Sequence, residues 1–463
     1  MAKSPFSKRD EERQLTRRAL IKWSVAAGAA LGVSRAKILD ILEKTAGKDV
    51  AFAAGAAPTT RSVHLVAGNG GLAWFMGGFW PHYDVAAANN PNFATKTGMT
   101  TPVQGTHNPL TLSVDAPWQS LPPQNQVTAF VCGANQTHTR TPTSVTSLNG
   151  ANIFSVAGAL QASSPSVIPL ITIGDADAGT ATGAPTPANV SDASGIVGLF
   201  NSAASRSGGL LSNTSDAQLY KAHYDAFTQL NRAANRSTTK LSYTTASGAA
   251  QFLGTNLSAQ LSTTAADLQR YQITGNTPSN VAAIGNAFIV AVKAFKMGLT
   301  NCICMPAMDD DPHTAWDQGT INTVPGQLKA IFDAFMTDLQ MTTDDVTMQA
   351  LADDTVLTIH GDTHKDPFTR GGWPDNTPGG SNVVYVYSAG YLYSGWFGSV
   401  DRNQKLTGFD SNGKPATFNG TSETNYALAS IAYAIAKSDD RATSTFTSGQ
   451  SVSGIFGPPK DLG

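Results

Sequence analysis

The sequence predicts an α/β protein, a three-layer sandwich built around a largely parallel sheet. The chain has 463 residues, of which 41% are hydrophobic, so it can bury a large core. Short apolar runs bounded by turn residues recur along it, as in strands that are covered on both faces. From residue 301 onward these runs alternate with segments of helical period. Because alternating strands and helices form parallel sheets covered by helices, this order favours the α/β class.

The first half of the chain contains three strand candidates. Residues 62–67 form the first apolar run, and the glycine-rich turn at residues 68–71 ends it. Residues 74–123 are rich in aromatic residues and proline, follow no clear period, and predict a long irregular region. Residues 127–132 and 167–173 are the second and third apolar runs. All three have the length and the turn-forming neighbours expected of buried strands.

The middle of the chain, residues 174–298, predicts an insertion that is partly helical. Residues 174–209 are rich in Ala, Gly, Thr, Ser and Pro, which favours a long surface excursion. Residues 263–271 and 281–297 predict helices. An apolar stripe at helical spacing predicts one more helix before them, formed by Leu219, Tyr220, His223, Tyr224, Phe227 and Leu230.

In the last third, strands and helices follow one another clearly. Strands are expected at residues 301–305, 355–360 and 382–387, and a final helix at residues 421–437. Between the first two strands, Pro325 marks the start of a helix. Its apolar face consists of Leu328, Ile331, Phe332, Phe335, Met336 and Leu339.

The amino-terminal region has the pattern of a bacterial twin-arginine export signal. Arg17 and Arg18 precede the apolar stretch 23–33, which is too short and too rich in Ala and Gly to span a bilayer stably. A cluster of small residues at 51–57 would suit a signal peptidase. We therefore expect a signal peptide and spacer at residues 1–57, one domain at residues 58–463, and a periplasmic or secreted protein without a transmembrane segment in its mature form.

The net charge of the chain after residue 50 argues against two classes of partner, nucleic acid and anionic lipid. The first 50 residues contain 11 of the 31 Lys and Arg residues and 6 of the 33 Asp and Glu residues. The remainder carries 20 basic and 27 acidic residues, a net charge of −7. Such a surface does not attract nucleic acid or anionic lipid.

The three cysteines leave two interpretations open. Cys302 and Cys304 lie two apart in an expected strand, so both thiols face the same way. Cys132 could form a disulfide with either of them in an oxidising compartment. Alternatively, all three are small buried hydrophobic residues.

Two Asp-x-His motifs follow successive predicted strands and suggest a metal site. They are Asp311-x-His313 and Asp362-x-His364. In an extended segment, residues two apart point the same way, so each pair could converge on one ion. Carboxylate oxygen and imidazole nitrogen together suit zinc, manganese or iron better than calcium. Because ligands bind beyond the carboxyl ends of strands in open α/β sheets, the position also fits.

Both motifs have a structural alternative, as does a further acidic candidate. The Asp-x-His residues could instead cap helices or pair with Lys365 and Arg370. Asp375, in the glycine- and proline-rich segment 370–382, is a further possible ligand. The alternative for Asp375 is a plain turn, because Pro-Asp-Asn and Pro-Gly-Gly are strong turn formers.

A loop rich in threonine follows the second predicted strand and supplies candidate catalytic residues. If a helix follows, Thr141 could act as a nucleophile there, because the amino end of a helix would stabilise an oxyanion. Arg140 could bind an anionic ester group. The alternative is a solvated loop.

The order of these parts resembles an uncharacterised bacterial family that is exported by the twin-arginine route and grouped with the alkaline phosphatase and sulfatase superfamily. Residues 68–72 (Gly-Asn-Gly-Gly-Leu) stand in place of the family's Gly-Gly-x-Asp-Gly-Leu, and residues 139–142 in place of Thr-Arg-Ser-His. Residues 310–313 keep the Asp and His of Trp-Asp-Thr-His. Residues 360–364 replace the Glu-Phe-Gly-Arg segment, and residues 371–376 replace Gly-Gly-x-Asp-His. The resemblance covers most of the chain after about residue 61.

The resemblance implies an alkaline phosphatase-like fold and an exported, metal-dependent hydrolase of phosphate or sulfate esters. A two-metal clamp would stabilise the attacking and leaving oxygens, and a hydroxyl nucleophile would lie between them. The departures imply an alternative, since Gly70, Pro142 and Asn376 stand where the family has polar ligands. The alternative is a non-catalytic member of the same fold, an envelope binding or surface-assembly protein. A small anionic ester or a glycan would be the ligand.

Overall fold

The computed structural model describes most of the chain after residue 59. The described residues are 60–79, 101–103, 110–122, 125–135, 140, 144–162, 164, 166–200, 257–312, 323–345, 347–362, 364–366, 379–401 and 403–457. The predicted signal peptide and the stripe of Leu219 to Leu230 therefore lie outside them.

Two compact units divide the chain. The smaller unit includes residues 194–262, and its described part contains most of helix α7 (Ala193–Phe200) and helix α10 (Leu257–Leu261). The larger unit, called the main unit below, comprises residues 52–164, 168–193 and 263–463. All further description concerns the main unit, which contains the candidate site.

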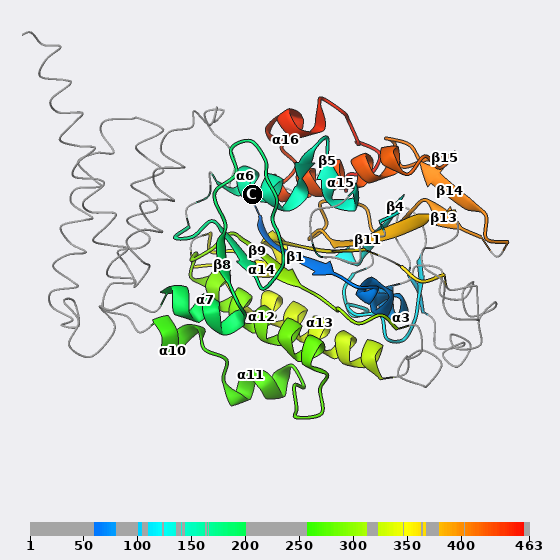
Figure 1. Cartoon of the computed structure of the whole chain (residues 1–463). Coiled ribbons are helices and arrows are strands. Elements are labelled where there is room, and N and C mark those ends of the chain that lie inside the picture. The colour runs from blue at the N-terminus through cyan, green and yellow to red at the C-terminus, as the bar shows by residue number, and fades with distance from the viewer. Residues whose placement is uncertain are drawn as a thin grey trace, which may run out of the picture. The chain divides into compact units, whose positions relative to one another are not determined.

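An eight-stranded sheet forms the centre of the main unit (Figure 1). Its order is β12-β4-β11-β10-β1-β9-β7-β8, and β11 runs antiparallel to both of its neighbours while all other pairings are parallel. The strands are β1 (Arg61–Ala67), β4 (Thr128–Gly133), β7 (Leu170–Ile173), β8 (Ala188–Val190), β9 (Cys302–Pro306), β10 (Thr355–Gly361), β11 (Ser381–Tyr387) and β12 (Gly395–Phe397). The predicted α/β class and the largely parallel sheet are confirmed.

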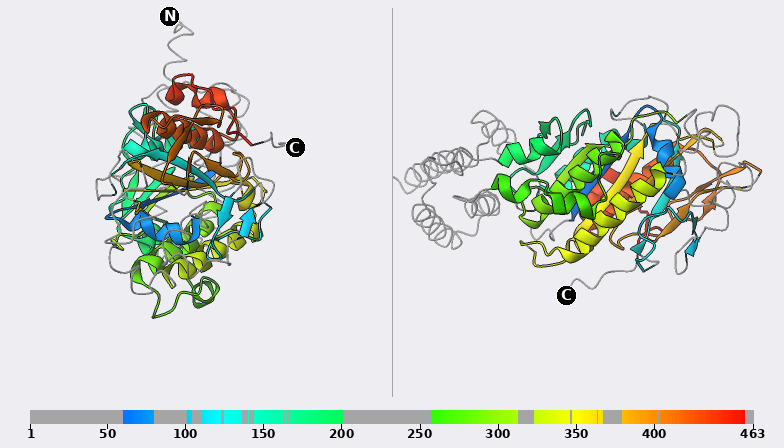
Figure 2. Two further views of the ribbon diagram at one scale, coloured as in Figure 1. Left: turned by 90° about the vertical axis from the view of Figure 1, so that its right-hand side faces the viewer. Right: turned by 90° about the horizontal axis from the view of Figure 1, so that it is seen from below.

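Helices pack against both faces of this sheet (Figure 2). Because neighbouring side chains on a strand alternate, odd and even positions of β1 face opposite layers. His64 packs against Phe154, at a ring-centroid distance of 5.1 Å, on the face covered by α6 (Ile153–Gln161) and α15 (Thr421–Ile435). The other face meets α12 (Ser279–Lys296) and α13 (Val324–Met341). The apolar stripe predicted for the helix after Pro325 is buried in α13.

The remaining elements of the main unit are short. They are η1 (Gly71–Phe75), α3 (Met76–Phe79), β2 (Thr101–Val103), β3 (Leu110–Leu112), η3 (Ser144–Thr146), β5 (Ser147–Leu148), β6 (Ala151–Asn152), α11 (Ala265–Arg270), α14 (Leu351–Asp354), β13 (Ser399–Val400), β14 (Leu406–Phe409), β15 (Pro415–Ala416) and α16 (Asp440–Thr447).

Part of the region expected to be irregular is an aromatic core. Phe79 contacts Trp118, Phe332 and Tyr385 at ring-centroid distances of 5.4, 5.5 and 5.4 Å. The Trp118 indole also donates a hydrogen bond to the Phe332 carbonyl over 3.0 Å. The prediction of irregular structure throughout residues 74–123 was wrong, because helix α3 and the antiparallel strands β2 and β3 lie within that range.

Two other expectations need correction. Residues 174–209 were expected to form a surface excursion, but β8 lies within them and extends the sheet beside β7. The helix predicted at residues 421–437 is α15, which is not the last one, because α16 follows it. Asp439 caps α16 by accepting hydrogen bonds from the Arg441 and Ala442 amides over 3.1 and 3.3 Å.

All three cysteines are buried free thiols. Cys132 lies on β4, and β11, β10 and β1 separate that strand from Cys302 and Cys304 on β9. Four steps between neighbouring strands amount to about 19 Å. A disulfide requires α-carbons within about 7 Å, so Cys132 cannot bridge to either partner. The interpretation as small buried residues holds.

Candidate functional site

The candidate residues gather at the carboxyl edge of the parallel strands. Strands β1, β9 and β10 run in the same direction and end side by side, so the loops that follow them emerge together. These loops contain Gly70, Asp311 and the segment from Asp362 to Lys365. Ligands of open α/β sheets bind at this edge, which makes it the place to look for chemistry.

Gly70 lies next to both of the candidate ligands Asp311 and Asp362. Its amide donates to both carboxylate oxygens of Asp362, each at 3.1 Å. Its φ is +76°, and a β-carbon added there would lie 2.9 Å from Cγ of Asp311. Asp311 and Asp362, which come from different strand ends, therefore both border Gly70. No side chain fits at this position without displacing one of them.

Asp311 makes an ion pair with a buried lysine. The Lys365 ammonium lies 2.9 Å from Oδ1 of Asp311, and the lysine side chain is 0% exposed against 25% for the aspartate. The pairing of an Asp-x-His residue with Lys365, which the sequence left open as an alternative, is thus the arrangement that Asp311 adopts. A buried ammonium next to this carboxylate neutralises its charge.

His364 faces a different neighbour from Asp362. Its Nε2 lies 2.9 Å from the hydroxyl of Tyr385, and both side chains are buried. Burial lowers the pKa of His364 to about 3, so the ring is neutral at neutral pH. The two side chains do not point at a common ion, because the chain bends at Asp362 after β10 ends and the extended geometry assumed for Asp-x-His is lost.

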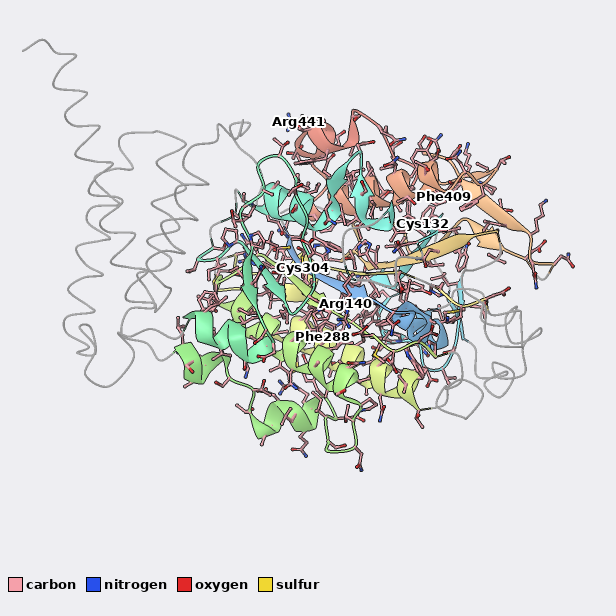
Figure 3. All side chains as sticks on the ribbon, viewed as in Figure 1. Cys132, Arg140, Phe288, Cys304, Phe409 and Arg441 are labelled. Carbon is pink, nitrogen blue, oxygen red and sulfur yellow. The ribbon has the colours of Figure 1, made fainter. Side chains whose placement is uncertain are left out.

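Arg140, labelled in Figure 3, contacts residues of the loops that follow β7 and β9. Its guanidinium pairs with Asp175 at 2.6 Å and with Asp309 at 3.1 Å, and it also donates to the Ala307 carbonyl over 3.3 Å. The arginine side chain is 9% exposed, whereas the two aspartates are 66% and 46% exposed. Arg140 is therefore held in place by carboxylates of the chain itself.

Two asparagines that the sequence analysis missed hold the end of β10. The side-chain amides of Asn135 and Asn382 donate to the Gly361 carbonyl over 2.8 and 3.2 Å. Asn382 also donates to the Asp362 carbonyl. Asn382 stands at the start of an otherwise apolar strand, and that polar position was the available signal.

Three of the predicted residues lie outside the described part of the chain. They are Thr141, the candidate nucleophile, and the candidate ligands His313 and Asp375. Their positions in the site remain predictions from the sequence.

The described candidate ligands do not fit a divalent metal by themselves. Within the described residues, no group of three or more His, Cys, Asp or Glu side chains is arranged to hold an ion. Asp311 faces the Lys365 ammonium, Asp362 accepts from the Gly70 amide, and His364 bonds to Tyr385. An ammonium 2.9 Å from the carboxylate would repel a metal cation bound there.

A groove of about 620 Å³ opens at the same edge, beyond β4 and the start of β11. Its walls come from the end of β4, the β5–β6 turn, the residues before β11 and the start of α15. No side chain that lines it carries a charge. We call it the α15 groove.

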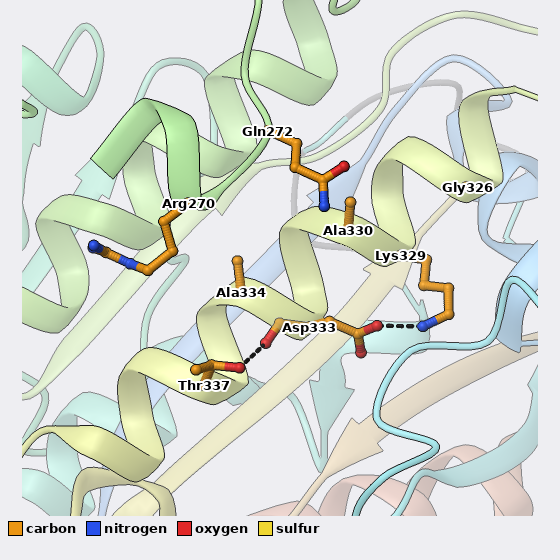
Figure 4. A pocket seen from close by; sticks show the side chains of 8 residues that line it. All are labelled: Arg270, Gln272, Gly326, Lys329, Ala330, Asp333, Ala334 and Thr337. Carbon is orange, nitrogen blue, oxygen red and sulfur yellow. Dashed lines mark hydrogen bonds and ion pairs between the residues drawn. The ribbon is translucent and has the colours of Figure 1, made fainter. Parts of the chain in front are cut away.

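A second hollow of about 440 Å³ lies along α13 (Figure 4). Its charged side chains are already paired, since Lys329 binds Asp333 and Arg270 binds Asp338 at 2.7 Å. The walls come from α13 and from the end of α11, not from a loop that follows a sheet strand. The charged groups of the α13 hollow are therefore engaged with carboxylates or ammonium groups of the chain itself.

Searches of family models, of curated proteins and of solved structures find no match for this chain. No helix in the described ranges is long and apolar enough to cross a membrane.

Proposed function

We propose that this chain is an exported binding protein on an alkaline phosphatase-like fold, in which internal ion pairs replace the charges that a hydrolase would present to its substrate. The ion pair between Lys365 and Asp311 carries this proposal. The mostly parallel sheet is compatible with such a fold, and Arg17 and Arg18 support export to the periplasm or beyond.

A hydrolase of anionic esters needs positive charge that is open to the substrate. Arg140 and Lys365 are the two cationic side chains described at the β7, β9 and β10 ends, and both contact carboxylates at 3.1 Å or less. A phosphate or sulfate group would have to displace Asp175 and Asp309 from Arg140, or Asp311 from a fully buried lysine. Either exchange gives up a charge-assisted contact that is already made.

Gly70 supports the same conclusion. The family that the sequence resembles has an acidic residue at this position, whereas here Asp311 and Asp362 close over the glycine. An added carboxylate would bring a third negative charge into contact with the first two. The packing at Gly70 favours a site that has lost its metal.

A second candidate function is a metal-dependent hydrolase of phosphate or sulfate esters. The observation that favours it is that Asp311 and Asp362 both lie next to Gly70 at the carboxyl edge. Zinc, manganese or iron would then be held by these carboxylates with His313 and Asp375. Thr141 would be the nucleophile, and Arg140 would bind the anionic group.

Metal content and ester hydrolysis of the mature protein distinguish the two functions. The protein would be purified from the periplasm without a chelating tag, analysed by elemental mass spectrometry, and assayed with p-nitrophenyl phosphate and p-nitrophenyl sulfate. We expect no stoichiometric metal and no turnover above that of a Thr141→Ala variant.

One or two equivalents of metal that Asp311→Asn removes, together with turnover that falls in the same variant, would establish the hydrolase instead. Asp338→Asn is the matched control, because it also removes one carboxylate from an ion pair but lies on α13.

A further inference from the structure

We infer that the α15 groove binds a neutral carbohydrate. This inference rests on the proposed binding function and adds a ligand class and a location to it. The groove's position, lining, charge and rigidity support it independently of the ion pairs described above.

The groove lies where this fold places ligands. Gly133 ends β4, and Gly379 and Gly380 precede β11, so the groove opens at the carboxyl edge of the parallel strands. Its volume of about 620 Å³ is within the range of small-molecule sites, roughly 300 to 1,000 Å³. An oligosaccharide segment of two or three rings matches this space.

The polar side chains of the lining carry both hydrogen-bond donors and acceptors. The polar lining side chains are Ser147, Asn149, Asn419, Thr421, Thr424 and Asn425. Side-chain amides and hydroxyls offer donors and acceptors together, as sugar hydroxyls do. Five of the thirteen lining residues are glycines, which lets a ligand approach the backbone closely. The half-buried ring of Phe418 adds an apolar surface on which the C–H face of a sugar ring can stack.

Charge favours a neutral ligand over an anionic one. The lining contains no Lys, Arg or His. The start of α15 would otherwise attract an anion, but Glu423 is buried there and accepts hydrogen bonds from the Gly420 and Asn419 amides at 2.7 and 3.1 Å. A phosphate or sulfate group at the start of α15 would face the Glu423 carboxylate, because the backbone amides of Asn419 and Gly420 already donate to it. The groove therefore selects against anionic sugars.

Internal hydrogen bonds keep the walls in place before a ligand arrives. Thr424 accepts from the Gly133 amide over 3.0 Å and donates to the Gly420 carbonyl over 2.8 Å, which ties β4 to α15. The Asn149 side chain donates to the Phe446 carbonyl over 2.8 Å, and Asn425 accepts from the Asn149 amide over 3.4 Å. Such preorganisation lowers the entropic cost of binding.

Calorimetric titration of the mature protein tests the inference. The probes are neutral oligosaccharides of glucose, mannose, xylose and N-acetylglucosamine, with polygalacturonate and dextran sulfate as anionic comparators. We expect at least one neutral oligosaccharide to bind at micromolar to millimolar concentration, and neither anionic polymer to bind.

Three variants locate the binding. Phe418→Leu and Asn425→Ala should each weaken it about tenfold, which corresponds to about 1.4 kcal/mol. Thr421→Trp, at an exposed position on the groove wall, should abolish it. The matched control is Phe456→Leu, because Phe456 is a partly exposed phenylalanine that stacks on Tyr433 outside the lining. This variant should bind as the unmodified protein does.

The inference is wrong if no neutral oligosaccharide binds, if the anionic polymers bind better, or if the folded groove variants bind as well as the unmodified chain. Circular dichroism of each variant confirms folding, and Asn425→Ala changes the least packing. Metal and turnover measurements report on the proposed binding function separately. Carbohydrate binding in a protein that also hydrolyses esters would overturn that function and leave the groove assignment standing.

Discussion

The ammonium of Lys365 lies 2.9 Å from the carboxylate of Asp311, although the lysine side chain is wholly buried and the aspartate is a quarter exposed. This asymmetry has an energetic consequence. The aspartate keeps some contact with water, whereas the lysine depends on groups of the protein to stabilise its charge.

Asp311→Asn should therefore destabilise the fold more than Lys365→Met does. We expect the free energy of unfolding in urea to fall by about 3 kcal/mol for Asp311→Asn, because that change removes the carboxylate from a buried ammonium. Lys365→Met should cost less, since it removes the buried charge itself. As control, Asp338→Asn should cost no more than about 1 kcal/mol, because its partner Arg270 is 39% exposed. Equal losses for the two site variants would contradict this account.

Gly70→Ala should destabilise the protein through two separate effects. The left-handed φ of +76° disfavours any side chain, and the new β-carbon would lie 2.9 Å from Cγ of Asp311. Gly449→Ala isolates the first effect, because its φ is +74° and open space surrounds it. We expect about 1–2 kcal/mol for Gly449→Ala and a clearly larger loss for Gly70→Ala in denaturant titrations. Similar losses would mean that Asp311 does not close over Gly70.

The stability of the protein should fall as the pH drops below about 6.5. Burial lowers the pKa values of His360 and His364 from 6.5 to about 3. Above pH 6.5 both rings are neutral in the folded and unfolded states, so they cause no pH dependence. Between pH 6.5 and 3 the unfolded state takes up protons that the folded state excludes. Each histidine then lowers the free energy of unfolding by about 1.4 kcal/mol per pH unit.

Replacement of one of these histidines isolates its contribution to the pH dependence of stability. His360→Phe keeps an aromatic ring against Phe154, which lies 5.1 Å away, and removes the titrating group. We expect the slope of the unfolding free energy against pH, between pH 6.5 and 3, to decrease by the contribution of one histidine, about 1.4 kcal/mol per pH unit. Parallel curves for the variant and the unmodified protein would show that His360 is protonated in the folded state.

The three cysteines should not react with thiol reagents in the native protein. Cys132, Cys302 and Cys304 are each 0% exposed. Burial also raises the pKa of the Cys132 thiol well above its ordinary value, so its reactive thiolate is scarce. A thiol-specific chromogenic reagent should report no reaction under native conditions and three thiols after denaturation without reductant. A count of one after denaturation would reveal a disulfide.

Much of the fold follows from local patterns. The apolar runs now seen as β1, β4 and β10, and the stripe that α13 buries, are marked by the period and length of their hydrophobic residues. Strand β8 was missed because Ala188-Asn-Val190 has no apolar run, and its pairing with β7 alone makes it a strand. The reversed direction of β11 also left no local mark, since parallel and antiparallel buried strands look alike in sequence.

The candidate site was only partly predictable. Spacing identified Asp311, Asp362 and His364 at strand ends, and these ends do lie at one edge. The sequence offered Lys365 as a possible ion-pair partner, but it did not show that Asp311 is the aspartate that Lys365 contacts. The contacts of Asp362 with Gly70 and of His364 with Tyr385 were not visible, because Gly70 and Tyr385 come from other segments. The α15 groove was also hidden, since four separate segments build it.

Hydrophobic period and turn residues act over short distances, so the α/β class, the order of most strands and helices, and the strand ends at which polar residues gather could be predicted from the chain alone. Which charge each aspartate contacts depends on how distant segments come together in the folded protein. Asp311 and Lys365 lie on different loops, and the parallel alignment of β9, β1 and β10 brings them within 2.9 Å. Electrostatic contacts of this kind depend on distance in space, and no local pattern in the chain records that distance.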